Sequence, residues 1–308
     1  MEYDLISVIM STYNEKETWI KQSIESILNQ TYKNIEFIIV LDNPENIILD
    51  NIIENYRKKD RRIIYIKNDI NKGLVYSLNR AISMSKGKYI ARMDADDISL
   101  NMRLEKQKKY LEENKLDFIG TNVINFNDNG EFTSNYPQNT KDIYKYLNSA
   151  NAMAHPTWFL KREVFQKVGQ YRNIFANEDY DFLLRCRNQN IKIGNMDKPL
   201  LKYRLSSNSI SRSNIFEQQV TTYFLSKNFN RINSITENEI NKFLAKFNDK
   251  VKNRYLNAYS FAYKSSLLKK NNFRFWIYKF KALTISLLYF RIRYLRRILI
   301  KTKNLFSN

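Results

Sequence analysis

The sequence predicts an α/β fold in which a mostly parallel sheet carries helices on both faces, followed by a helical C-terminal region. Short apolar runs alternate with amphipathic segments through the first two thirds of the 308 residues. This alternation is typical of strand–helix–strand units with right-handed crossovers. The apolar runs are continuous, as in parallel strands that are covered on both faces. After about residue 212 the strand pattern stops and a helical pattern continues.

The N-terminal part predicts four strands, each followed by a helix. Each strand is an apolar run that ends in polar or turn residues, and each helix repeats apolar residues on one face. The strands are Ile6–Ser11, Ile35–Leu41, Ile63–Lys67 and Tyr89–Met93. The helices cover residues 15–30, 45–58, 74–85 and 101–114. Such a Rossmann-like sheet binds ligands outside the carboxyl ends of its strands, so the loops after these strands are the expected site.

Further strands and helices follow before the chain becomes helical throughout. The additional strands are predicted at Asp117–Phe126 and Pro199–Arg204, and the additional helices at residues 141–147, at 161–168 and from 178. In the C-terminal region, Thr236 and Glu239 have the spacing of a capping box and predict the start of a helix.

The composition excludes several kinds of site. With one cysteine, Cys186, and one histidine, His155, the chain has no disulfide framework, no cysteine zinc site and no multi-histidine metal site. The N-terminus is acidic and leads directly into a strand, so we expect no signal peptide. The longest uncharged apolar-leaning run near the C-terminus, Ala282–Phe290, has nine residues. A membrane-spanning helix needs roughly 20.

The net charge of +20 is concentrated in the C-terminal third. From Arg212 onward there are 20 Lys and Arg against 4 Asp and Glu, whereas the preceding residues hold 31 and 27. Together with the loss of the strand pattern, this difference predicts one domain over residues 1–212 and a basic helical region over 213–308. Nucleic-acid binding is an alternative for so basic a chain. The charge lies away from the sheet loops and no nucleic-acid motif is present, so we expect no such partner.

Three carboxylates, Asp94, Asp96 and Asp97, follow the fourth predicted strand. Carboxylates this close raise one another's pKa unless a cation lies between them. Asp94 and Asp96, separated by Ala95, can both reach one oxygen-preferring ion such as Mg²⁺ or Mn²⁺, which keeps positions for substrate phosphates. The motif therefore indicates a metal-bound diphosphate. A solvated acidic turn before the next helix is the alternative.

These stretches together resemble the family 2 glycosyltransferases, the inverting nucleotide-sugar transferases of glycosyltransferase A fold. The resemblance covers roughly Leu5–Ser211. It rests on several ordered motifs, which are Ser7-Val8-Ile9-Met10-Ser11-Thr12-Tyr13-Asn14, Gln30-Thr31-Tyr32, Glu36-Phe37-Ile38-Ile39-Val40, Asn71-Lys72-Gly73, Asp94-Ala95-Asp96, Glu178-Asp179 and Tyr203-Arg204.

The resemblance implies a role for each matched residue. Asp94 and Asp96 would bind the metal, Asp179 would be the general base, and Asp42 would hydrogen-bond the uracil ring. The other nucleotide-sugar contacts that it implies are Ser11, Thr12, Tyr13, Asn14, Lys72, Arg92, Ala95, Glu178 and Arg204. Five of these residues have a plainer alternative. Glu178 and Asp179 would be acids at a helix N-terminus, Asp42 would be a turn residue, Tyr13 would pack in the core, and Arg204 would pair with a buried acid. We expect His155 to be a packed residue, and a contact to the acceptor or the diphosphate is the alternative.

The resemblance also implies the reaction. A Mn²⁺- or Mg²⁺-dependent hexosyl- or N-acetylhexosaminyltransferase would move a sugar from a UDP-sugar to a glycan or lipid-linked glycan in surface polysaccharide synthesis. The sequence departs from the family at Asn43-Pro44, where an acid and a Gly-Ser turn are usual, and at Ser206, where a histidine often stands. A non-catalytic relative that binds nucleotide-sugars is therefore an alternative.

The segment from Arg274 to Lys301 combines apolar and aromatic residues with many cations. A basic amphipathic helix of this kind indicates attachment to a membrane surface. We expect Phe275 and Trp276 to insert and the cations to face the anionic inner leaflet, which places the protein in the cytoplasm at the cell membrane. A helical appendage that packs on the first domain is the alternative.

Overall fold

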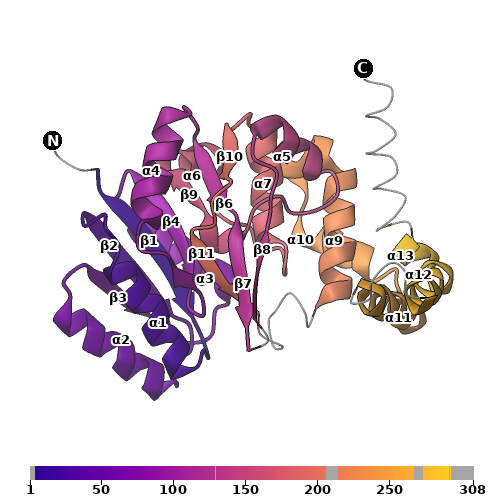
Figure 1. Ribbon diagram of the computed structural model, residues 1–308, viewed down its shortest axis with the longest axis horizontal. Helices are drawn as coiled ribbons and strands as arrows, with labels where there is room; N and C mark the ends of the chain where they lie inside the picture. The colour runs from indigo at the N-terminus through magenta and orange to yellow at the C-terminus, as the bar shows by residue number, and fades with distance from the viewer. Residues whose placement is uncertain (1–3, 129, 206–213, 267–272, 291, 293–308) are drawn as a thin grey trace. The chain divides into compact units, whose positions relative to one another are not determined.

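The computed structural model describes residues 4–128, 130–205, 214–266, 273–290 and 292 (Figure 1). The chain forms two compact units. The first comprises residues 1–173 and 178–207, and the second comprises residues 174–177 and 208–308.

A seven-stranded sheet forms the centre of the first unit, with the strand order β10-β6-β9-β4-β1-β2-β3. β9 is antiparallel to both of its neighbours, and the other strand pairs are parallel. The strands are β1 (Ile6–Thr12), β2 (Ile35–Leu41), β3 (Ile63–Lys67), β4 (Tyr89–Asp94), β6 (Phe118–Thr121), β9 (Phe159–Lys161) and β10 (Ile193–Met196). The predicted mostly parallel α/β fold is confirmed.

Helices connect these strands at nearly the predicted positions. They are α1 (Glu17–Leu28), α2 (Ile47–Lys59), α3 (Leu74–Met84), α4 (Arg103–Glu113), α5 (Thr140–Tyr146), η1 (His155–Thr157), α6 (Arg162–Val168) and α7 (Glu178–Asn188). Asn46 begins α2 by accepting a hydrogen bond from the Leu49 N–H at 3.0 Å, which satisfies a helix N–H that has no partner within the helix. Every residue of β2 is buried, so both faces of the sheet are covered.

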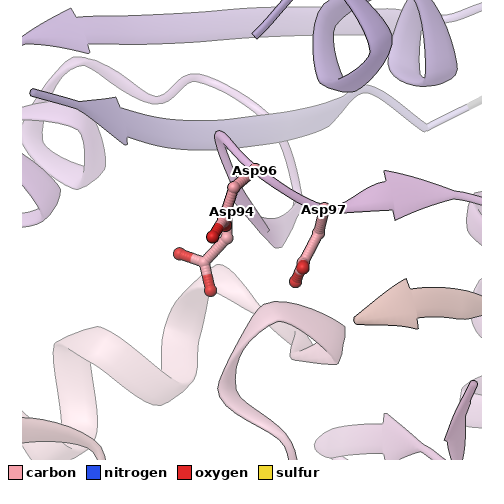
Figure 2. Close-up of side chains that lie close together, drawn as sticks. All are labelled: Asp94, Asp96 and Asp97. Carbon is pink, nitrogen blue, oxygen red and sulfur yellow. The ribbon is translucent and has the colours of Figure 1, made fainter. Parts of the chain in front are cut away.

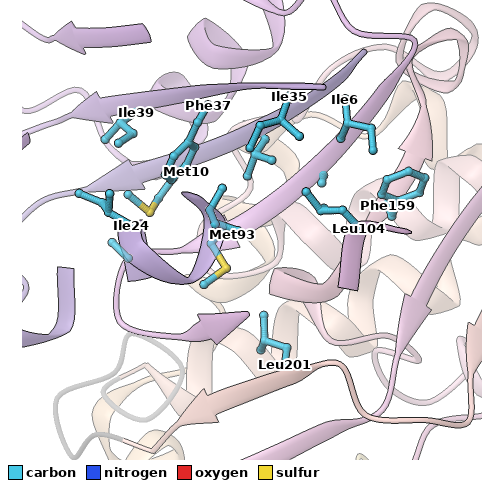
Figure 3. Close-up of a cluster of buried hydrophobic side chains, with 14 of the residues drawn as sticks. Ile6, Met10, Ile24, Ile35, Phe37, Ile39, Met93, Leu104, Phe159 and Leu201 are labelled. Atoms are coloured by element: carbon cyan, nitrogen blue, oxygen red, sulfur yellow. The ribbon is translucent and has the colours of Figure 1, made fainter. Parts of the chain in front are cut away.

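The core holds the carboxyl ends of the strands in place. Figure 3 shows side chains of β1, β2 and β4 meeting those of α1 and α4, among them Met10, Phe37 and Met93. Burying such a side chain stabilises the fold by about 1.5–3 kcal/mol. The loops that follow these strands therefore start from fixed positions.

A second sheet of four strands, in the order β5-β11-β7-β8, lies in the first unit. Its strands are β5 (Ile98–Ser99), β7 (Val123–Asn127), β8 (Gly130–Ser134) and β11 (Leu201–Arg204). β5 directly follows the three acids, and it pairs with β11.

The single strand predicted over Asp117–Phe126 is wrong, because the chain divides there between the two sheets. β6 ends at Thr121, and β7 starts at Val123. The intervening Asn122 is buried, and its side chain donates to the Asp197 carbonyl at 2.6 Å and accepts from the Tyr136 N–H at 2.9 Å. These hydrogen bonds hold the chain where it changes sheets.

The second unit is helical in its described residues. Its elements are α9 (Ile215–Lys227), η2 (Phe229–Ser234), α10 (Glu237–Leu244), α11 (Asp249–Ser266), α12 (Phe273–Ile285) and α13 (Leu287–Phe290). Thr236 accepts a hydrogen bond from the Glu239 N–H at 3.2 Å, as the capping box predicts. A cluster that includes Phe216, Tyr255 and Tyr289 forms its core. Within the described residues, no helix has the length and apolar character needed to cross a bilayer.

Candidate active site

Three loops meet at the carboxyl edge of the central sheet. In the strand register, Ser11 of β1 lies beside Val40 of β2 on one side and beside Asp94 of β4 on the other. The Asp42 N–H donates to the Thr12 carbonyl at 2.8 Å, which ties the first two loops together. The sheet therefore brings the three predicted loops together.

The acids Asp94, Asp96 and Asp97 form one cluster, in which an oxygen of each lies within 4.8 Å of the others. Figure 2 shows the three side chains extending from one side of the loop, with Asp94 and Asp96 next to each other. Burial and the Asp94 charge raise the pKa of Asp96 to about 7. Burial and both neighbouring carboxylates raise the pKa of Asp97 well above its ordinary value.

This cluster fits a divalent metal ion. Its ligands are all carboxylate oxygens, which Mg²⁺ and Mn²⁺ prefer. Asp97 Oδ2 is buried and has no hydrogen-bond partner among the described residues. A buried acceptor without a partner is costly, and a bound cation would remove both that cost and the mutual repulsion. Asp97 joins the two predicted ligands, Asp94 and Asp96, in this cluster.

Arg204 lies at the acid cluster because β11 pairs with β5. Its backbone N–H donates to Asp97 Oδ1 at 2.8 Å, and its Nε donates to the Asp96 carbonyl at 2.7 Å. Its guanidinium also lies 4.9 Å from the centre of the Trp19 ring and 4.4 Å from that of Phe126. Arg204, which is predicted to contact the nucleotide-sugar, therefore lies beside the predicted metal ligands.

Asp42 is buried and holds the turn that contains Lys72. Its carboxylate accepts hydrogen bonds from Asn68 Nδ2 at 2.6 Å, from the Lys72 N–H at 2.8 Å and from the Gly73 N–H at 2.7 Å. Gly73 has φ +86°, a conformation that favours glycine. A uracil ring would have to share the Asp42 carboxylate with this turn.

The loop after β1 is organised by Glu15, which the sequence analysis did not single out. Its carboxylate accepts from Thr12 Oγ1 at 2.5 Å and from the Tyr13 N–H at 2.8 Å. Tyr13 is 44% exposed, so it is available to a ligand and does not pack in the core. Asn14 Oδ1 accepts from Asn43 Nδ2 at 2.9 Å, which gives the unusual Asn43 a structural role.

Glu178 and Asp179 open α7. Asp179 accepts hydrogen bonds from Asn151 Nδ2 at 2.5 Å and from the Tyr180 N–H at 2.6 Å. Burial raises the pKa of Asp179 to about 6. Burial and the Asp179 charge raise the pKa of Glu178 to about 8. Burial therefore raises the pKa of both neighbouring acids, and it raises the pKa of Glu178 more than that of Asp179.

Arg92 and His155 are buried near these acids. Arg92 Nη2 lies 2.5 Å from Asp94 Oδ1, whereas Arg92 Nε and Nη1 are buried without a hydrogen-bond partner among the described residues. His155 Nε2 lies 2.8 Å from the Tyr171 hydroxyl, and Nδ1 lies 3.9 Å from Glu178 Oε1. Burial and the Arg92 charge hold the pKa of His155 well below its ordinary value. His155 is thus a neutral, packed residue.

Comparison with known proteins identifies the family. The sequence profile of the family described as glycosyl transferase family 2 matches residues 7–169. An uncharacterized glycosyltransferase of Methanocaldococcus jannaschii is 41% identical over 74% of this chain and 80% of its own length. The chain belongs to glycosyltransferase family 2.

Further relatives carry more specific names. The O-antigen biosynthesis glycosyltransferase WbnJ of Escherichia coli is 38% identical over 72% of this chain and 88% of its own length. The E. coli UDP-Glc:alpha-D-GlcNAc-diphosphoundecaprenol beta-1,3-glucosyltransferase WfaP is 33% identical over 70% and 82%, respectively. The crystal structure of S. aureus TarS 1–349 in complex with UDP-GlcNAc aligns with a TM-score of 0.60 at 18% identity, over 97% of this chain and 87% of that one. This last likeness concerns the fold.

The family match does not cover every predicted site residue. It includes Asp42 and the acid cluster but ends at residue 169, before Glu178 and Asp179. The assignment of Asp179 therefore depends on its surroundings in the structure. Ser206 lies outside the described residues.

Proposed function

We propose that this chain is an inverting transferase that moves a hexosyl or N-acetylhexosaminyl group from a UDP-sugar to a hydroxyl of a glycan or lipid-linked glycan. The proposed setting is surface polysaccharide synthesis. The names of WbnJ and WfaP and the UDP-GlcNAc bound to TarS support the donor, the acceptor class and the setting. In this proposal residues 1–212 form the nucleotide-sugar-binding catalytic domain.

One observation carries the proposal: the half-buried Asp179, held by hydrogen bonds from Asn151 and the Tyr180 N–H, belongs to the same unit as the cluster of Asp94, Asp96 and Asp97. Transfer needs a base on the acceptor side and a positive counter-charge on the diphosphate side. In this proposal residues of the first unit supply both: Asp179 the base, and the acid cluster the ligands of the counter-charge. A protein that only binds sugars would need neither a general base nor a cluster of carboxylates that repel one another.

The base is Asp179. Its carboxylate takes the proton of the acceptor hydroxyl as the acceptor oxygen attacks the anomeric carbon. The bond between that carbon and the UDP oxygen breaks as the new glycosidic bond forms, and the proton remains on Asp179. One in-line displacement inverts the configuration, so an α-linked donor gives a β-linked product.

The leaving group is UDP, on which negative charge develops. Asp94, Asp96 and Asp97 would hold Mg²⁺ or Mn²⁺, and that ion would supply charge neutralisation at the diphosphate. Arg204 adds a cation beside the acid cluster. The loop from Ser11 to Asn14 and the turn at Lys72 would bind the nucleoside, with Asp42 supporting that turn.

We also infer that the second unit, including the basic region 213–308, attaches the enzyme to the anionic inner face of the cell membrane. In α12, Phe273, Trp276 and Phe280 are 78%, 55% and 68% exposed, and their spacing places them on one side of the helix. Cations near an anionic surface contribute on the order of 1 kcal/mol each. Exposed aromatic residues next to cations suit this interface. The side chain of Phe275 and residues 293–301 of the predicted helix lie outside the described residues.

The experiment that tests this function is a panel of nucleotide-sugars assayed for release of the nucleoside diphosphate, with lipid-linked glycans as acceptors. We expect release from one or more UDP-sugars that depends on metal and increases with acceptor. Binding without release from any donor would favour the non-catalytic alternative. Release from GDP- or CMP-sugars instead would contradict the UDP assignment.

A further inference from the structure

Asn151 lies in the segment before η1, is half-buried, and makes a direct contact with Asp179. Its Nδ2 donates to Asp179 Oδ2 at 2.5 Å, and its Oδ1 accepts from the Met153 N–H at 3.0 Å. A backbone N–H can only donate a hydrogen bond, so the amide oxygen must face Met153 and the amide N–H groups must face the carboxylate. The orientation of the Asn151 side chain is therefore fixed by its own loop.

The loop that carries Asn151 is itself anchored in the core. Asn195 of β10 is fully buried, and its Nδ2 donates to the Ala152 carbonyl at 3.0 Å and to the Pro137 carbonyl at 2.7 Å. Ala152 and Met153 are buried as well. A side chain that orients a reacting group must itself be held by packing and hydrogen bonds. Asn151 meets this condition.

The two oxygens of Asp179 are held from different parts of the first unit. Oδ1 accepts from the Tyr180 N–H at 2.6 Å, which is a contact between neighbouring residues of α7. Oδ2 accepts from Asn151, which joins α7 to the loop before η1. Among the described residues, the Asn151 amide is the hydrogen-bond donor from outside α7 that reaches this carboxylate. Burial raises the pKa of Asp179, and the Asn151 hydrogen bond opposes that effect by stabilising the charged form.

We propose that Asn151 is a positioning residue whose amide holds the Asp179 carboxylate in the orientation in which it takes the proton of the acceptor hydroxyl. This proposal rests on the proposed function, because it takes Asp179 as the base. It gives the Asn151 side chain one task at each end, since the oxygen holds the loop and the N–H groups hold the base. A suitable substitution can separate these two tasks.

Asn151→Asp separates them. The new carboxylate keeps an oxygen for the Met153 N–H, but it loses the donor toward Asp179 and places a second negative charge beside it. Two carboxylates this close share a proton, and the pKa of one rises strongly. We expect kcat/KM at pH 7 to fall about tenfold or more, and the loss of activity at acidic pH to begin about one pH unit or more higher than in the wild type. Calorimetric binding of the UDP-sugar should be unchanged.

Other charged or titratable groups act on Asp179, but they are the same in the wild type and in Asn151→Asp. They are Arg92 of β4, Glu178 of α7, Tyr136 and Tyr171. A difference between the two pH profiles therefore reports the change at position 151.

Asn139→Asp is the matched control, because Asn139 makes the same two kinds of contact with Asp142 instead of Asp179. Its Nδ2 donates to Asp142 Oδ2 at 2.8 Å, and its Oδ1 accepts from the Asp142 N–H at 2.9 Å. Aspartate caps a helix as well as asparagine does, so α5 should still begin there. We expect the ratio of control to wild-type kcat/KM to be the same at every pH. A ratio that is equally constant for Asn151→Asp would overturn the proposal.

Asn151→Ala removes both contacts of the side chain. We expect kcat to fall about tenfold or more while the KM for the donor stays unchanged, because the base is misplaced and the donor site is intact. If this variant does not fold, Asn151→Asp still decides the question, since it keeps the contact to Met153.

A double variant separates this proposal from the assignment of the base. In the background of Asp179→Asn, the further change Asn151→Ala should cause no additional loss of transfer. A loss by the same factor as in the wild-type background would show that Asn151 acts independently of Asp179, which contradicts the proposal. Full activity of Asp179→Asn alone would instead refute the base assignment itself, whatever the Asn151 variants do.

Discussion

Replacing Asp179 by Asn changes the proposed base with little change in size. The carboxylate accepts one hydrogen bond from Asn151 Nδ2 and another from the Tyr180 N–H, so each of its oxygens faces a donor. An amide can satisfy only one of these donors with its oxygen, and it cannot take the proton of the acceptor hydroxyl. We expect the variant to bind the UDP-sugar normally and to lose transfer.

The expected loss follows from the role and from the pKa. A positioned general base contributes about 10²–10⁴-fold to the rate, so the variant should lose transfer by that factor. Burial raises the pKa of Asp179 to about 6. Because only the carboxylate form can take the proton, kcat/KM of the wild type should decrease as the pH falls through about 6. The residual kcat/KM of Asp179→Asn should not show this decrease at acidic pH.

The assay measures UDP release and product formation across pH, together with calorimetric binding of the UDP-sugar. Asp181→Asn is the control, because Asp181 is fully buried and paired with Arg172 and Arg185. Breaking a buried ion pair typically destabilises a protein by about 3–5 kcal/mol. Asp181→Asn should therefore unfold at a lower temperature, but its kcat/KM should still decrease at acidic pH. Transfer by Asp179→Asn at the wild-type rate would refute the assignment of the base.

Three further predictions concern the metal, the nucleotide and the membrane. Asp96→Ala should lower the rate of transfer by about 100-fold or more, because the acid cluster loses a metal ligand. Wild-type turnover that persists in excess chelator would contradict the metal requirement. UDP should bind at least about tenfold more tightly than GDP in calorimetry, and equal affinities would show that the turn held by Asp42 does not select uracil. The full chain should sediment with anionic vesicles and less so in high salt, whereas the triple change of Phe273, Trp276 and Phe280 to Ser should stay in solution. Equal sedimentation of both forms would show that the exposed aromatic residues of α12 do not attach the protein to the membrane.

Much of the fold could be predicted because its strands are long and apolar. β2 and β3 have the predicted boundaries, since their residues pack in the sheet and polar residues follow immediately. β5, β8 and β10 could not be predicted because they have two to five residues and no clear periodicity. The break at Asn122 was missed for a similar reason, because only the long-range hydrogen bonds to Asp197 and Tyr136 divide the segment.

The position of the site was predictable from topology, whereas its hydrogen bonding was not. Parallel strands bring Ser11 and Asp94 to one edge whatever the side chains do. The contributions of Glu15 and Asn151 depend on side-chain geometry, and neither stands in a motif that would single it out. Arg92 could be named from the sequence, but its burial and its ion pair with Asp94 appear only when the sheet is assembled.

The configuration of the product tests the mechanism most directly. With the α-linked UDP-sugar and the acceptor identified by the panel, the anomeric proton of the first product formed is followed by nuclear magnetic resonance. A single displacement with Asp179 as base predicts a β-linked product at the earliest times, and no such product from Asp179→Asn. An α-linked product would contradict the account, because retention requires a second displacement for which the mechanism assigns no residue.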